Sequence, residues 1–184
     1  MATKKSKKHL VWIDCEMTGL EPERESLIEI ATIITDYDLN IVARGPVLAI
    51  KAPAARLAGM NAWNRRTHGA SGLLDRVKRE GVSLAEAERQ TLNFIRKHCY
   101  AQTAPICGNS VGHDKRFIAK YMPKVYNFLN YRVIDVSTIK VLSKEWYGGK
   151  YPGPPKQELH LALADIEESI EELRYWRKTV FRNE

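Results

Sequence analysis

The sequence predicts a single α/β domain in which helices flank a mixed five-stranded sheet. Three strand-like stretches rich in β-branched residues come first, and short turns join them as in an antiparallel meander. Helical and strand-like segments then alternate up to a final amphipathic helix. The 184 residues, 44% of them hydrophobic, are enough for one core. We therefore expect a basic, flexible tail over residues 1–9 and one folded domain over residues 10–184.

The first strand, within Leu10–Gly19, ends in two carboxylates. Side chains alternate between the two faces of a strand, so Asp14 and Glu16 share one face, about 7 Å apart along the chain. Two like charges placed there raise each other's pKa or bind a cation between them, and a hard divalent cation is the usual solution. The alternative is that both are solvated residues at a strand end. Acidic residues further along the chain decide between these interpretations.

The elements expected next are strands at Leu27–Thr35 and Ile41–Ile50, a short helix at Pro53–Met60 and a loop at Asn61–Gly72. Gly45 and Pro46 interrupt the third strand. The loop carries Trp63, with Arg65 and Arg66 close behind it. An exposed tryptophan among basic residues suits base stacking and phosphate contact. The alternative is a tryptophan that belongs to the core.

A third acidic position follows a helix and a strand. The capping box Ser83-Leu84-Ala85-Glu86 opens an amphipathic helix, and Ala104–Ser110 is a strand that runs into a glycine turn. Asp114 begins the next helix, because apolar side chains follow it at i+3, i+4 and i+7. A carboxylate in a first turn also stabilises a helix through its dipole, so this position alone does not identify a metal ligand.

The last strand is expected at Tyr131–Val136. Ser137 is in a position to cap a helix that runs to about Tyr147. The segment Gly148–Pro155 contains three glycines and three prolines, so it is a loop.

The final helix carries the last acidic candidate. Its apolar stripe consists of Leu163, Ile166, Ile170 and Leu173. Asp165 lies at the edge of this stripe, where a partly buried carboxylate needs a partner. His160 precedes it by five residues, a rotation of about 500° on a helix, so we expect His160 to project from the helix entry or the loop before it. A lone histidine at such a place is also a common capping or surface residue.

Composition limits the class of protein. Three widely spaced cysteines, Cys15, Cys99 and Cys107, indicate a reducing, cytoplasmic compartment rather than a disulfide framework or a zinc site. The sequence has no apolar run of about 18 residues and no signal-type segment, so we expect no membrane association. The net charge of +7 favours a polyanionic partner. Lysines in the N-terminal tail supply four of these charges, which argues against a long channel that grips many phosphates.

Taken in order, Asp14-Cys15-Glu16, Asp114, His160 and Asp165 resemble the DEDD exonuclease superfamily in its histidine-bearing branch. Flanking segments narrow the resemblance to the oligoribonuclease family, and it covers about Leu10 to Phe181. These segments are Trp12–Leu20, Trp63 with Arg66-Thr67-His68, Ala70–Leu73, Pro105–Ser110 and Asp135–Thr138.

The resemblance implies a ribonuclease-H-like fold and a 3′-to-5′ exoribonuclease. Such an enzyme releases nucleoside 5′-monophosphates from very short RNA, about two to five nucleotides long, with two Mg²⁺ or Mn²⁺ ions. Asp14, Glu16, Asp114 and Asp165 would hold the metals. His160 would take the proton from the attacking water, a role that suits an imidazole because its ordinary pKa is about 6.5.

By the same resemblance, six residues contact the single-stranded substrate. Leu20 would wedge between bases and Trp63 and His68 would line the pocket. The residues implied to hold the terminal phosphate are Ser110, Ser137 and Lys140. Members of this family act as homodimers, in which residues matching Tyr131 and Arg132 reach into the partner's site.

Two other functions remain open at this stage. A proofreading-type exonuclease that acts on DNA or longer RNA would use the same acids. A non-catalytic nucleic-acid-binding module would have structural carboxylates, but a basic protein that carries four acids and a histidine in this order favours catalysis.

Overall fold

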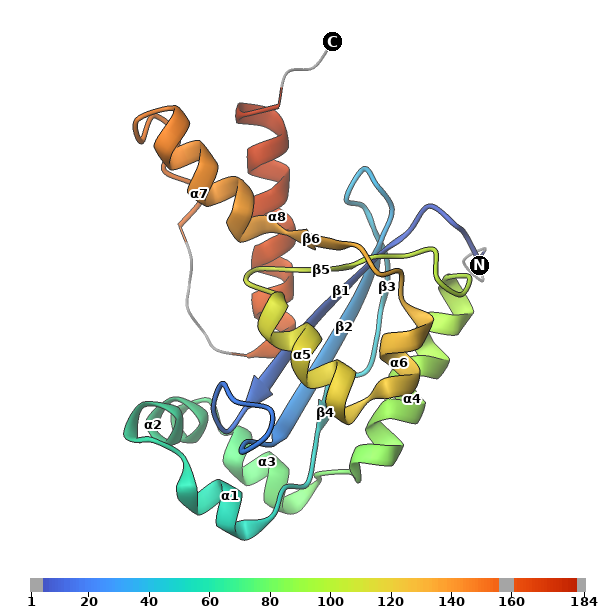
Figure 1. Ribbon diagram of the computed structural model, residues 1–184, viewed down its shortest axis with the longest axis vertical. Helices are drawn as coiled ribbons and strands as arrows, with labels where there is room; N and C mark the ends of the chain where they lie inside the picture. The colour runs from blue at the N-terminus through green and yellow to red at the C-terminus, as the bar shows by residue number, and fades with distance from the viewer. Residues whose placement is uncertain (1–4, 156–160, 182–184) are drawn as a thin grey trace.

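The computed structural model describes residues 5–155 and 161–181 (Figure 1). The strands are β1 (Leu10–Met17), β2 (Leu27–Thr35), β3 (Ile41–Arg44), β4 (Leu48–Ala49), β5 (Ile106–Gly108) and β6 (Val133–Asp135). The helices are α1 (Ala54–Gly59), α2 (Ala62–Ala70), α3 (Leu73–Arg79), α4 (Leu84–His98), α5 (Gly112–Tyr121), α6 (Pro123–Phe128), α7 (Val136–Trp146) and α8 (Ala162–Thr179).

The strands form one mixed sheet in the order β3-β2-β1-β5-β6, and β4 pairs with β2 beside β3. β1, β2 and β3 are antiparallel neighbours, as the predicted meander requires, whereas β5 and β6 are parallel to β1 and to each other. The predicted α/β class with a mixed sheet is confirmed. β1 is the central strand. The points at which the neighbouring strands end therefore determine which side chains can contact the last residues of β1.

The sheet has six strands among the described residues rather than the expected five, because the predicted third strand divides into β3 and β4. The division falls at Gly45, whose N–H donates to the Thr32 carbonyl at 2.8 Å. A Cβ on Gly45 would lie 2.7 Å from the Phe94 ring, so only glycine allows this close approach. Pro46 then has no N–H with which to continue the ladder.

Helices cover both faces of the sheet. Figure 1 shows α4, α5 and α6 on one side and α8 on the other. Val11, Ile13 and Cys15 of β1 belong to the core under α4, α5 and α6, whereas Leu10 and Trp12 belong to the core under α8. The alternation of β1 therefore places Asp14 and Glu16 on the same face as α8.

The segment Asn61–Gly72, predicted to be a loop, forms α2 instead. The Asn61 side chain caps this helix by accepting a hydrogen bond from the Asn64 N–H at 2.8 Å. The helix lacks an apolar stripe because it is attached by polar side chains, so its sequence does not show the helical period. The short helices α3 and α6 were also not predicted.

Two predicted caps have different outcomes. Ser83 does cap α4, because its hydroxyl accepts from the Glu86 N–H at 3.2 Å. The predicted cap of α7 was wrong: Asp135 occupies this position, and its carboxylate accepts from the Ser137 N–H at 3.0 Å. α5 begins where the helical period predicts, with Asp114 in its first turn, and α8 also carries Asp165 in its first turn.

Part of the expected N-terminal tail makes contacts with the domain. The Ser6 N–H donates to the His98 carbonyl at 2.9 Å, and the same carbonyl accepts from the His9 imidazole, also at 2.9 Å. Over residues 5–155 and 161–181, no helix combines the length and the apolar composition that a membrane crossing requires.

The packing predicts a difference between two leucine truncations. Leu92 of α4 is 4% exposed in the core, whereas Leu20 is 62% exposed. Leu92→Ala should lower the free energy of unfolding by about 2–5 kcal/mol, because it removes buried methyl groups and leaves a cavity. Leu20→Ala should change it by less than about 0.5 kcal/mol. Urea denaturation of both variants measures this, and equal losses would contradict the core assignment.

Candidate active site

Three carboxylates meet where β1 ends. Oxygens of Asp14 and Glu16 on β1 and of Asp165 on α8 all lie within 4.8 Å of one another. The helix reaches them because it packs on the face of the sheet to which Asp14 and Glu16 point. Three carboxylates at this separation form a donor set that suits a hard cation.

Asp114 approaches the same place from α5, where β5 no longer pairs with β1. β5 pairs with β1 only at Val11 and Trp12, so the Cys15 N–H lies beyond the end of that ladder. Asp114, in the first turn of α5, accepts a hydrogen bond from this N–H at 2.8 Å and is buried. The structure thus brings together all four acids that the sequence singled out.

The pKa values of three of these acids are raised. Burial raises the pKa of Asp14 well above its usual range, and the charges of Asp114, Glu16 and Asp165 raise it further. Burial and the neighbouring carboxylates raise the pKa of Glu16 to about 8. Burial also raises the pKa of Asp114 to about 7, although the hydrogen bond from Cys15 acts in the opposite direction.

The repulsion between these carboxylates and their raised pKa values fit a site that binds a divalent metal. At neutral pH the cluster must keep protons on its carboxylates or gain positive charge from a cation. Oxygen ligands from carboxylates are those that Mg²⁺ and Mn²⁺ prefer. The donor set therefore fits the ions that the sequence resemblance implies.

Glu29 is a fifth acid that the sequence analysis missed. It lies opposite Glu16 in the register of β1 and β2, and its side chain is 1% exposed. The Arg76 guanidinium of α3 forms an ion pair with it. The available signal was a single charge within the otherwise apolar and β-branched run of Leu27–Thr35.

α2 is attached to the backbone just after the acids. Asn64 donates to the Thr18 carbonyl at 2.8 Å, and the His68 Nε2 donates to the Met17 carbonyl at 2.9 Å. The other ring nitrogen of His68 lies 3.7 Å from a Glu16 oxygen, and the side chain is buried. Trp63 on the same helix is 52% exposed, so it is not the core tryptophan of the alternative interpretation.

The serines that the resemblance assigns to phosphate binding lie together. The hydroxyls of Ser110 and Ser137 are 3.1 Å apart, and the Ser110 N–H donates to the Ser137 hydroxyl at 2.9 Å. Ser110 has φ +51°, a conformation that a serine rarely adopts. Lys140 is one turn after Ser137 on α7 and is exposed.

The Asn109 side-chain amide supports this pair of serines. Asn109 accepts from the Ser137 hydroxyl at 3.1 Å and donates to the Ser169 hydroxyl at 2.9 Å and the Glu172 carboxylate at 3.0 Å. Both Ser169 and Glu172 are buried on α8. The helix that carries Asp165 therefore also holds the turn that carries Ser110.

Tyr131 and Arg132 lie before β6, away from any apolar core. Tyr131 is 74% exposed, and the Arg132 guanidinium lies 4.9 Å from the centre of its ring. His160 lies outside the described residues, which resume at Leu161.

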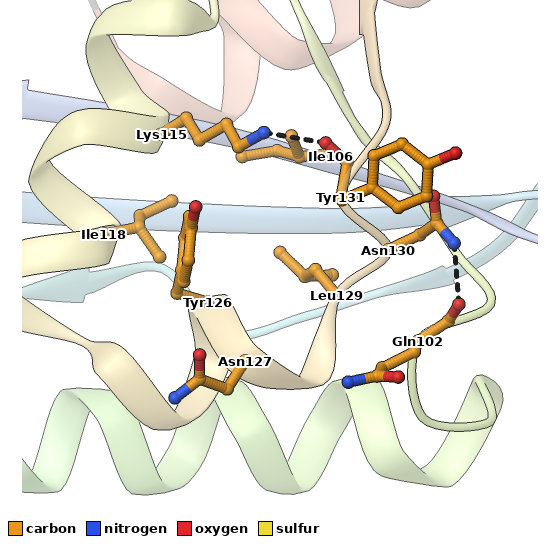
Figure 2. Close-up of a pocket in the computed structure, with 9 residues that line it drawn as sticks. All are labelled: Gln102, Ile106, Lys115, Ile118, Tyr126, Asn127, Leu129, Asn130 and Tyr131. Carbon is orange, nitrogen blue, oxygen red and sulfur yellow. Dashed lines mark hydrogen bonds between the residues drawn. The ribbon is translucent and has the colours of Figure 1, made fainter.

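A cavity of about 360 Å³ lies beside Tyr131, between α5 and α6 (Figure 2). Lys115 donates to the Tyr131 carbonyl at 2.8 Å, and Asn130 donates to the Gln102 carbonyl at 2.7 Å, as Figure 2 shows. These bonds hold the backbone of the segment while the Tyr131 side chain projects. The four acids do not line this cavity.

Comparison with known proteins identifies the class of this site. Residues 11–173 match the family model described as Exonuclease. The mixed sheet, the four carboxylates near the end of its central strand and this family match identify the protein as a nuclease. Nucleases belong to the hydrolase class of enzymes.

Curated relatives narrow the class to one family. Oligoribonuclease from Marinobacter nauticus is 55% identical over 173 residues, which are 94% of this chain and 96% of the relative. Oligoribonuclease from Thiobacillus denitrificans is 51% identical over 176 residues, 96% of this chain and 97% of the relative. The chain therefore belongs to the oligoribonuclease family, and the resemblance seen in the sequence is confirmed.

Solved structures confirm the fold. Exonuclease I from Methylocaldum szegediense has a TM-score of 0.69 at 18% identity over 94% of this chain. The zinc-bound complex of E. coli exonuclease I with single-stranded DNA has a TM-score of 0.74 at 14% identity over 97% of this chain. The chain spans 41% and 42% of the length of these two proteins.

The raised pKa of Glu16 predicts how pH affects stability in the presence of a chelator. Its folded pKa of about 8 lies above the ordinary 4.5, so the folded state binds the proton more tightly than the unfolded state does. This contribution to stability is complete below the ordinary pKa and is lost as pH rises through the folded one. Glu16→Gln should therefore become progressively more stable than the wild type between about pH 5 and pH 9.

Thermal unfolding of both proteins across this range checks the prediction. Glu80→Gln, which changes an exposed carboxylate, is the matched control and should keep a constant difference from the wild type. A constant difference for Glu16→Gln as well would contradict the raised pKa.

Proposed function

We propose that this protein is a 3′-to-5′ exoribonuclease that hydrolyses very short RNA, about two to five nucleotides long, to nucleoside 5′-monophosphates with two divalent cations. The observation that carries the proposal is the partly buried cluster of Asp14, Glu16 and Asp165, with the buried Asp114 beside it. The relatives named oligoribonuclease support the substrate class, because they match the chain over nearly its whole length.

The acids divide between two cation sites in this proposal. Asp14, Glu16 and Asp165 would hold one Mg²⁺ or Mn²⁺, since their oxygens already converge. Asp114, with Asp14, would support the second. When bound, the cations supply Lewis-acid stabilisation of the attacking and leaving oxygens of the phosphodiester. The chain contributes a rigid, partly buried frame that holds the carboxylates in place before the metals bind.

His160 is proposed to be the general base. Its assignment depends on the sequence pattern, in which it lies five residues before Asp165. α8 brings Asp165 to the other carboxylates within its first turn. An imidazole can accept a proton from a water molecule near neutral pH and release it to solvent.

Exposed side chains near the acids are proposed to contact the RNA. Leu20 follows β1 directly and Trp63 projects from α2, which Asn64 and His68 attach to the end of β1. An apolar side chain and an indole ring suit contact with bases. The buried His68 would form the wall of this pocket beside Glu16.

The terminal phosphate is proposed to contact Ser110, Ser137 and Lys140. Hydroxyl groups and an ammonium group are suitable hydrogen-bond donors to a phosphate. The fixed separation of the two hydroxyls supports this assignment, because a preformed pair loses little freedom when the anion binds. A short substrate also agrees with the charge, since few phosphates need to be neutralised.

A homodimer is part of the proposal, with Tyr131 and Arg132 of each protomer completing the partner's site. The exposed Tyr131 ring and the guanidinium beside it are available for such a contact. The hydrogen bond from Lys115 to the Tyr131 carbonyl holds the backbone that carries these two side chains (Figure 2). We also propose a cytoplasmic location, with which three free and buried cysteines agree.

The proposed length preference can be measured directly. Initial rates on 5′-labelled RNA of two, five, ten and twenty-five nucleotides should fall by about tenfold or more from the shortest to the longest, because a short site gains nothing from further phosphates. DNA of the same lengths separates this enzyme from a proofreading-type exonuclease. Asp14→Asn serves as the inactive control, and faster turnover of the longest substrate would contradict the proposal.

Mixed dimers test the contribution of the partner. Asp14→Asn and Arg132→Ala homodimers should each be strongly impaired, since one lacks a metal ligand and the other lacks the guanidinium from the partner. After subunit exchange, a heterodimer contains one site with intact acids that also receives Arg132. Activity should therefore exceed the sum of the two separate variants. No gain after exchange, verified by mass spectrometry of the heterodimer, would exclude a shared site.

A further inference from the structure

We infer that Glu29 and Arg76 are a positioning pair that fixes the start of α8, and with it Asp165, against the carboxylates of β1. The inference rests on the proposed metal site but concerns residues that are not ligands in it. It assigns a function to α3, which otherwise has no part in the site.

The Glu29 carboxylate connects three elements. One oxygen is bound to the Arg76 guanidinium of α3, and the other accepts from the Ala162 N–H at the start of α8, at 3.4 Å. Glu29 itself belongs to β2 and lies opposite Glu16. Figure 1 shows that α3 and the first turn of α8 lie at the same end of the sheet, where β1 ends.

The start of α8 needs such a contact. The first N–H groups of a helix have no partner within the helix, and Leu161 at the N-cap provides no side-chain cap. Glu29 supplies a carboxylate from another element at the positive end of the helix dipole. Since Asp165 is three residues after Ala162, a shift of this first turn moves Asp165 directly.

The pair also balances charge beside the site. Glu29 is 1% exposed and lies near Asp14 and Glu16, whose pKa values its charge raises. Without Arg76, a buried and uncompensated carboxylate would favour rearrangement or would compete for the cation. The Arg76 guanidinium also contacts Glu80, at 2.8 Å, but Glu80 is exposed to solvent.

Arg76→Met and Glu29→Gln test the pair, with Glu80→Gln as the matched control. Glu80 contacts the same guanidinium but is 62% exposed, so solvent screens this ion pair. Mn²⁺ affinity of the metal-free protein, measured by electron paramagnetic resonance of free Mn²⁺, should fall about tenfold or more in the first two variants. It should stay within about twofold in the control and recover in part in Arg76→Lys.

Amide hydrogen exchange of residues 161–165 provides the second measurement. Exchange should accelerate in Arg76→Met and Glu29→Gln but not in Glu80→Gln, because only the first two release the start of α8. If Arg76→Met does not fold, Arg76→Lys and Glu29→Gln decide the question, since both keep a hydrogen-bonding side chain. Mn²⁺ affinity and exchange rates that match the wild type in these folded variants would overturn the inference.

The two proposals can fail separately. A wild-type protein that binds no Mn²⁺ would refute the proposed metal site. The contact between Glu29 and α8 would still be decided by the exchange rates, which need neither a metal nor a substrate.

Discussion

The mutual repulsion of partly buried carboxylates at the end of β1 is the constraint on which the rest of the structure depends. Oxygens of Asp14, Glu16 and Asp165 lie within 4.8 Å of one another, and Asp114 approaches them from a different helix. Such an arrangement destabilises the protein unless a proton or a cation is present. It persists because β1 is central in the sheet and packs on both faces, so the strand cannot move to relieve the repulsion.

Asp114 and the helix that carries Asp165 are held by contacts to parts of the chain that are distant in sequence. The short β5 leaves the Cys15 N–H available to Asp114, and the buried Glu29 holds the first turn of α8, which carries Asp165. These supports explain how side chains that repel one another remain in one place. They also explain why a pair such as Glu29 and Arg76 affects the site without belonging to it.

The exposed residues proposed to contact the RNA are supported in the same way, by neighbouring residues that are hydrogen-bonded to other elements. Trp63 is exposed, while Asn64 and His68 on the same helix are buried and attach it to β1. Ser110 is exposed, while the half-buried Asn109 before it is hydrogen-bonded to α8. The side chains proposed to contact the ligand thus have neighbours that are hydrogen-bonded to other elements, so the fold orients them before a ligand arrives.

The sequence by itself determined the shared face of Asp14 and Glu16, the place of Asp114 at the start of a helix, and that of Asp165 at the edge of an apolar helical stripe. These features follow from periods of two and of 3.6 residues, which are local properties of the chain. Only the tertiary structure decided that Asn61–Gly72 is helical, that Asp135 caps α7, and that Glu29 binds Arg76 and Ala162, which are 47 and 133 residues away. The physical reason is that these depend on polar contacts, local for the cap by Asp135 and between distant segments for α2 and Glu29. Such contacts leave no periodic signal in the sequence.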